Sequence, residues 1–123
     1  MNVAIIGASA DRAKFGNRAV RAYLKRGWTV FPINKHEEQI EGLWVFKSIA
    51  EIPDKTDRIS IYLPPEIGFN VLDEIASSKS PKALVFFNPG SESAETIEKA
   101  KALGLNFISK CSIRDIGEDP NDY

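Results

Sequence analysis

The stretch VAIIGASADRAKFGNRAV, residues 3–20, predicts a strand, a long loop and the start of a helix. Its first four residues are apolar and end at Gly7, which is typical of a parallel strand covered on both faces. Apolar residues recur at helical spacing over residues 17–26, and Gly27 can end that helix in a left-handed conformation. The intervening loop, residues 8–15, is longer and richer in donors than a simple turn requires.

Further strands and helices alternate along the rest of the chain. The expected strands are residues 28–33, 57–63, 83–87 and 106–109, and the expected helices lie near 48–52, 65–75 and 94–103. Ser48 and Glu51 have the spacing of a capping box at the start of the first of these helices. This alternation favours an α/β, Rossmann-like fold: a doubly wound parallel sheet of five strands in the order 3-2-1-4-5, with helices on both faces.

Length and composition predict one domain over residues 1–112. The chain has 123 residues, of which 43% are hydrophobic, so it can bury a sizeable core. Residues 113–123 contain Gly, Pro and several acids or amides, and they are expected to form a mobile, acidic C-terminal tail. A single cysteine, Cys111, allows no internal disulfide and no CxxC pair.

Charge and hydropathy narrow the class of partner. Sixteen Lys and Arg against 17 Asp and Glu give a net charge of -1, so no global positive field would attract nucleic acid or an acidic membrane. No apolar run approaches the roughly 20 residues that cross a bilayer. The start of the chain shows no signal-peptide pattern, and a cytoplasmic location is expected.

A ligand site is expected where the strand order reverses, beyond the carboxyl ends of the strands. For the order 3-2-1-4-5 this point lies between strands one and four, where the loops 8–15 and 88–93 would converge. Gly7 and Gly16 would let the backbone turn and approach a ligand closely, and the amides that begin the first helix would face an anion. The side chains that add donors in this region are Ser9, Arg12, Lys14 and Asn17.

The residues after the first two strands favour a nucleotide with a ribose phosphate. A GxGxxG fingerprint that began at Gly7 would need glycine in place of Ser9 and Arg12. Binding of NAD usually places an acid after the second strand, whereas this chain has NKH at residues 34–36. This chemistry suits coenzyme A and, less well, NADP.

Five motifs in order strengthen that interpretation. They are VAIIGAS with the basic loop that follows it, VFPINK, the segment from Gly42 to Pro53, ISIYLPPE and ALVFFNPGSES. Together they resemble the small stand-alone CoA-binding-domain proteins, which are related to the N-terminal domain of the succinyl-CoA synthetase alpha subunit. The resemblance covers residues 2–111 and implies a Rossmann-like domain with coenzyme A as its cofactor.

The resemblance also implies a set of binding residues. It assigns the CoA phosphates to the first loop, at Gly7, Ala8, Ser9, Arg12, Lys14, Phe15 and Gly16. Lys35, preceded by Asn34, matches the family's basic residue near the nucleotide phosphates. The corner that lines the ligand groove corresponds to Tyr62, Leu63, Pro64 and Pro65, and the loop after the fourth strand to Asn88, Pro89 and Gly90.

The sequence leaves three functions open. The first is a non-catalytic or regulatory module that binds coenzyme A or an acyl-CoA. The second is an enzyme of the NAD(P) class, which the missing glycines and the missing acid oppose. The third is a scaffold that has lost ligand binding and acts through GLWVF, residues 42–46, with a homodimer or another protein as its partner. His36, the only histidine, has no visible partner for nucleophilic catalysis and cannot form a metal site alone.

Overall fold

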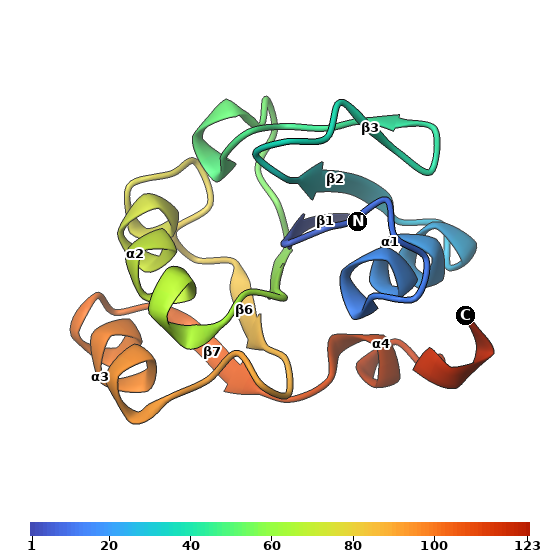
Figure 1. Ribbon diagram of the computed structural model, residues 1–123. Helices are drawn as coiled ribbons and strands as arrows, with labels where there is room; N and C mark the ends of the chain where they lie inside the picture. Colours follow the sequence, from blue (N-terminus) through green and yellow to red (C-terminus); the bar gives the residue numbers. More distant parts are fainter.

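Five parallel strands form the centre of the molecule in the computed structural model, which describes all residues, 1–123 (Figure 1). The strands are β1 (Asn2–Ile6), β2 (Thr29–Ile33), β5 (Arg58–Ile61), β6 (Leu84–Phe87) and β7 (Asn106–Ser109). They are paired in the order β2-β1-β5-β6-β7, and every neighbouring pair is parallel. Parallel pairing requires a crossover between successive strands, and helices supply most of these crossovers.

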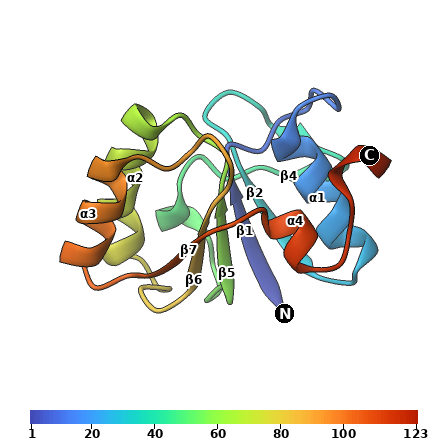
Figure 2. The ribbon, with the colours of Figure 1, turned by 90° about the horizontal axis from the view of Figure 1, so that it is seen from below.

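Helices cover both faces of this sheet (Figure 2). On one face lie α1 (Phe15–Lys25) and α4 (Ser112–Asp115), and on the other lie α2 (Pro65–Ala76) and α3 (Ala94–Ala102). Two short 3-10 turns complete the fold, η1 (Ile49–Glu51) and η2 (Pro120–Asp122). None of these helices combines the length and the apolar character needed to span a membrane.

The core is divided by the sheet because successive strand residues point to opposite faces. Val3 and Ile5 of β1 belong to a cluster of 10 buried residues on the α1 face. Ala4 and Ile6 belong to a cluster of 15 buried residues on the α2 and α3 face. The apolar run in β1 therefore reflects burial on both sides, as its sequence predicts.

The predicted fold class is confirmed, and the structure shows which segment takes each place in the order. Phe46 forms a parallel bridge with Ile33 on the outer edge of β2, so its segment takes the third position of the 3-2-1-4-5 pattern. Residues 57–63, counted as strand three from the sequence, become β5 and take the fourth position beside β1. Because Phe46 forms only a single bridge, its segment has no apolar run long enough to predict a strand. The sequence therefore predicts no strand at this segment and assigns the third position to residues 57–63. The expected meeting of the loops after β1 and β6 is therefore wrong: the order reverses between β1 and β5.

A small hairpin follows β2 where the sequence predicts only a polar excursion. Its strands are β3 (Gln39–Ile40) and β4 (Leu43–Trp44), which pair antiparallel. Glu41 and Gly42 between them both have positive φ angles, 49° and 77°, as a two-residue type I′ turn requires. Within GLWVF the exposed apolar side chain is that of Trp44, at 71%, whereas the other apolar side chains of that motif pack against the two cores.

The end of the chain does not form the mobile tail that its composition predicts. Ile113 is fully buried, and Glu118 pairs with Arg26 and Lys25 at the end of α1, at 2.6 and 3.2 Å. Tyr123 also donates a hydrogen bond of 2.6 Å to Glu118. One buried isoleucine and a carboxylate beside a basic helix end are long-range features, which composition alone does not reveal.

The capping box predicted at Ser48 and Glu51 is also wrong. The segment forms only the three-residue turn η1, and the Ser48 side chain makes no capping hydrogen bond. Such a short 3-10 turn does not bring the third residue into the position that the motif needs. A capping box forms instead between Ser93 and Thr96 at the start of α3.

Candidate functional site

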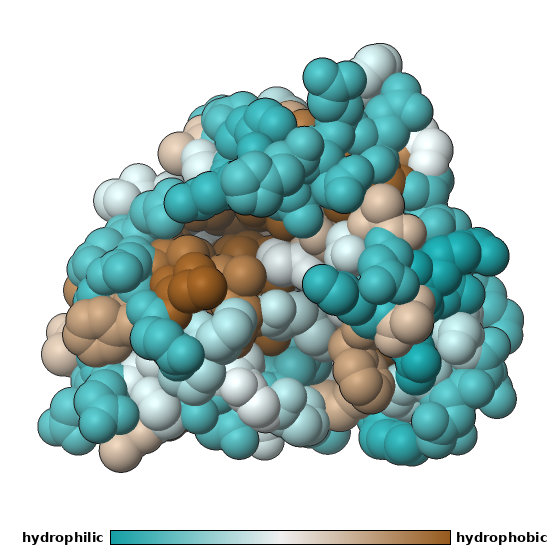
Figure 3. Space-filling view, in the orientation of Figure 1, coloured by the Kyte–Doolittle hydropathy of each residue, from teal (hydrophilic) through white to brown (hydrophobic).

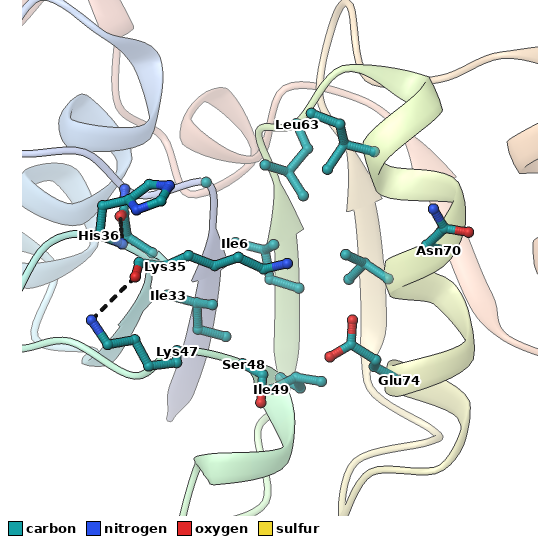
Figure 4. A pocket seen from close by; sticks show the side chains of 14 residues that line it. Ile6, Ile33, Lys35, His36, Lys47, Ser48, Ile49, Leu63, Asn70 and Glu74 are labelled. Carbon is teal, nitrogen blue, oxygen red and sulfur yellow. Dashed lines mark hydrogen bonds between the residues drawn. The ribbon is translucent and has the colours of Figure 1, made fainter.

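A cavity of about 480 Å³ opens at the carboxyl ends of β1 and β2. Figure 3 shows it as an apolar hollow beneath a hydrophilic ridge. One wall is α2, and the other comes from the segments that follow β2 and β4 (Figure 4). The apolar lining consists of Ile6, Ile33, Ile49, Leu63, Ile67 and Val71. A hollow of this size with an apolar interior can hold a small planar group such as a nucleobase.

Charged side chains line opposite walls of this cavity. Lys35 and Lys47 lie on the strand side and Glu74 on α2. In Figure 4 the Lys35 side chain reaches across the cavity toward α2. Its ammonium makes no ion pair, and neither does the Glu74 carboxylate. Lys47 Nζ donates to the backbone carbonyl oxygen of Lys35 at 3.2 Å, which places a second positive charge at the end of β2.

Asn34 shapes the turn that presents Lys35. Its Nδ2 donates to the carbonyl oxygen of Ala8 at 2.8 Å, and so ties the loop after β1 to the end of β2. Its Oδ1 accepts hydrogen bonds from the amides of His36 and Glu37, at 2.7 and 3.0 Å. The Asn34 side chain is therefore occupied within the protein, although the residue lines the cavity.

The loop after β1 leaves several backbone donors free. The amides of Gly7 and Ala8 both donate to the carbonyl oxygen of Ile33, at 3.2 Å. The amides in the loop and the first helical turn that make no hydrogen bond within the protein are those of Ser9, Ala10, Arg12, Phe15 and Gly16. No acid lies in the first turn of α1, and Lys14 provides no side-chain cap. The start of this helix can therefore accept an anion.

Close backbone packing explains the glycines at both ends of the loop. Gly7 has φ of +86°, and a Cβ added there would lie 2.5 Å from the carbonyl oxygen of Tyr62. A Cβ on Gly16 would overlap the carbonyl oxygen of Gly7. The two glycines let the loops after β1 and β5 and the start of α1 meet at one point.

The two basic residues of the loop differ in what surrounds them. Arg12 donates to both carboxylate oxygens of Glu41 in the hairpin turn, at 2.9 and 3.2 Å. These hydrogen bonds, with one of 3.1 Å from Asn17, hold the pKa of Glu41 below its usual value. Lys14 is exposed and makes no ion pair. Phe15 beside it is 53% exposed, so both can reach a ligand.

Tyr62 and Asn88 belong to a polar network away from the cavity. Asn88 donates to Ser60 Oγ at 2.8 Å and accepts from the amide of Ser112 at 2.9 Å. Tyr62 Oη lies 3.4 Å from Ser112 Oγ, and burial raises the pKa of this phenol. The network fastens α4 to β5 and β6. Pro64, Pro89 and Gly90 are exposed at the ends of nearby loops.

The cavity thus brings together Gly7, Asn34, Lys35 and Leu63 from the predicted binding residues. The lining residues that were not predicted as binding residues are Ile6, Ile33, His36, Lys47, Ser48, Ile49, Ile67, Asn70, Val71 and Glu74. On α2 the spacing of residues 67, 70, 71 and 74 places them on one helical face. The polar residues Asn70 and Glu74, which interrupt this otherwise apolar stripe, are the sequence signal that could have predicted a binding role for this face of α2.

The family model described as the CoA binding domain matches residues 1–115. The chain belongs to this family. Membership confirms both the resemblance found in the sequence and coenzyme A as the predicted cofactor.

Two relatives are alpha subunits of ADP-forming acetate–CoA ligases II and I from Pyrococcus furiosus, each 30% identical to this CoA binding domain. The matches cover 86% and 99% of this chain but 25% and 27% of those subunits. The chain therefore spans about a quarter of the length of these relatives. A solved structure, a conserved hypothetical protein of Pyrococcus furiosus, matches with a TM-score of 0.84 and 32% identity, over 93% of this chain and 97% of that one.

Proposed function

We propose that this protein binds coenzyme A or an acyl-CoA and acts as a binding module whose own side chains carry out no chemistry. The adenosine end occupies the cavity, and the diphosphate lies at the start of α1. The observation that carries this proposal is the combination of an apolar cavity, an unpaired Lys35 at its rim and free amides at Phe15 and Gly16.

Each part of the ligand has a matching group in this arrangement. The faces of an adenine ring are apolar and suit the isoleucine and leucine lining. A diphosphate accepts hydrogen bonds from the free amides of α1 and from Lys14, which adds positive charge. The ribose phosphate of CoA then lies at the end of β2, within reach of the lysine pair Lys35 and Lys47.

NADP is the second candidate because it also carries a ribose phosphate. The loop after β1 lacks the glycines of the dinucleotide fingerprint, which favours coenzyme A over NADP. A ligand comparison separates the two, since of two molecules that bind only the native state at equal concentration, the one with the higher affinity raises the melting temperature more.

Charge reversal at Lys35 tests the proposed site. We expect Lys35→Glu to weaken CoA binding at least about tenfold, because a lost ammonium–phosphate hydrogen bond is worth roughly 1.5–3 kcal/mol. Binding of 3'-dephospho-CoA should change much less, because it lacks the phosphate that Lys35 meets. Isothermal titration calorimetry with both ligands and with NADP measures the difference.

Lys82→Glu is the matched control, because Lys82 is an exposed lysine that precedes β6 at the opposite, amino end of the strands. It carries the same change in net charge and should leave both affinities unaltered. Equal losses for CoA and dephospho-CoA in Lys35→Glu would contradict the assignment of Lys35. Tighter binding of NADP than of CoA to the unmodified protein would reverse the order of the two candidates.

A further inference from the structure

We propose that Glu74, together with Ser48, recognises the exocyclic amino group of adenine and so restricts the cavity to adenine nucleotides. This inference rests on the proposed function and adds a base selectivity to it. It assigns a role to two polar residues that the phosphate contacts leave unused.

Glu74 faces the cavity from α2. It lies one helical turn beyond Asn70 and two turns beyond Ile67, and all three residues line the cavity. Figure 4 shows its carboxylate directed from the helix into the hollow. The hydrogen bond that Glu74 accepts from Ser77 goes to its backbone carbonyl, and its carboxylate makes no ion pair within the protein, so both carboxylate oxygens are free to accept hydrogen bonds from a ligand.

Ser48 stands on the opposite wall at the same end of the cavity (Figure 4). Because the expected capping box does not form, its hydroxyl makes no capping hydrogen bond. A hydroxyl can donate to a ring nitrogen or accept from an amino group. The two walls therefore offer a carboxylate and an adaptable hydroxyl to the edge of a base held between them.

The chemistry of the base decides which purine fits. Adenine carries an amino group at C6, and its two N–H bonds can donate to Glu74. Hypoxanthine and guanine carry a carbonyl oxygen there, which would face the carboxylate with lone pairs, so Glu74 could accept only from the neighbouring N1–H after a shift of the base within the cavity. A site built around a hydrogen bond discriminates strongly against an analogue that lacks the matching group.

The charges on the two walls also fix the orientation of the ligand. Lys35 and Lys47 attract the ribose phosphate, and Glu74 repels it. The phosphate is therefore drawn toward the lysine ammonium groups and away from the Glu74 carboxylate, and the amino edge of the base is directed toward Glu74. Neither charge is neutralised by an ion pair within the protein.

Calorimetry with adenosine 3',5'-bisphosphate and inosine 3',5'-bisphosphate tests this inference, because these probes differ at position 6 and the adjacent N1. We expect the unmodified protein to bind the adenosine form about tenfold or more tightly. Glu74→Ala should weaken the adenosine form and leave the inosine form equal or slightly stronger, so that the preference largely disappears. Glu66→Ala, which removes an exposed carboxylate at the start of the same helix, should preserve the preference.

Three outcomes would overturn the assignment. An undiminished adenine preference in Glu74→Ala, or no preference in the unmodified protein, would show that Glu74 does not recognise the base. An equal gain in affinity for both probes would show that its carboxylate only repels phosphate. If the unmodified protein binds neither probe nor coenzyme A, the proposed function fails as well, which distinguishes that failure from the other three.

Discussion

At the scale of single residues, the glycines of the first loop illustrate what a sequence can and cannot specify. Their presence predicts a tight turn, and the sequence favours a ligand as the reason. The structure shows a reason that needs no ligand, because Gly16 packs directly against the backbone of Gly7. Which atoms press on a glycine depends on contacts between distant segments, so spacing alone does not reveal it.

We therefore expect Gly16→Ala to destabilise the fold by about 1–3 kcal/mol, because the added methyl group overlaps a carbonyl oxygen of Gly7. Gly68→Ala is the matched control on α2. A Cβ there would meet only Ile61 at 3.8 Å, an ordinary contact. Alanine should stabilise that helix by about 0.5–1 kcal/mol. Urea unfolding measures both changes, and a neutral Gly16→Ala would contradict the packing.

At the scale of elements, the periodic segments follow the prediction and the short ones do not. The five main strands and α1, α2 and α3 lie within a few residues of their predicted bounds, because each presents a continuous apolar run or stripe to the core. The hairpin β3–β4, the turn η1 and the docked α4 and η2 depend on one or two long-range contacts. A local pattern of three or four residues does not encode such contacts.

The docking of the last segment should depend on pH through Glu118. Hydrogen bonds from Tyr123 and Arg26 lower the pKa of Glu118 from its ordinary 4.5 to about 2. Because the folded-state pKa is depressed, the stabilisation is complete above about pH 4.5 and is lost as the pH falls toward 2. The difference in melting temperature between the unmodified protein and Glu118→Gln should therefore be constant near neutral pH and shrink over that acidic range.

Glu98→Gln provides the comparison, because Glu98 is exposed on α3 and makes no ion pair. Its melting temperature should follow that of the unmodified protein at every pH. A Glu118→Gln difference that is equally large at pH 2 and pH 7 would show that the carboxylate charge does not hold the segment.

At the scale of the whole molecule, the sequence predicts the fold class and the ligand family but only part of the site. Gly7 and Asn34, which line the cavity, were predicted because each directly follows a strand, and Lys35 because it comes one residue later. Lys47, Ser48 and Glu74 reach the same cavity from two other segments, and only the order β2-β1-β5 brings those segments together. In the predicted order, residues 57–63 would form the edge strand beyond strand two. The helix that follows them, α2, would then lie away from the cavity.

The central claim is that coenzyme A occupies this cavity and the start of α1, and amide chemical shifts recorded during a CoA titration test it most directly. We predict that the largest changes occur at Phe15, Gly16, Lys35 and Ser48, with no change at Ile108 on the outer strand. A second hollow of about 540 Å³, lined by Pro65, Glu66, Phe69, Ser93 and Glu95, offers a different location. Changes confined to that hollow or to the Trp44 indole, with the cavity unaffected, would contradict the claim.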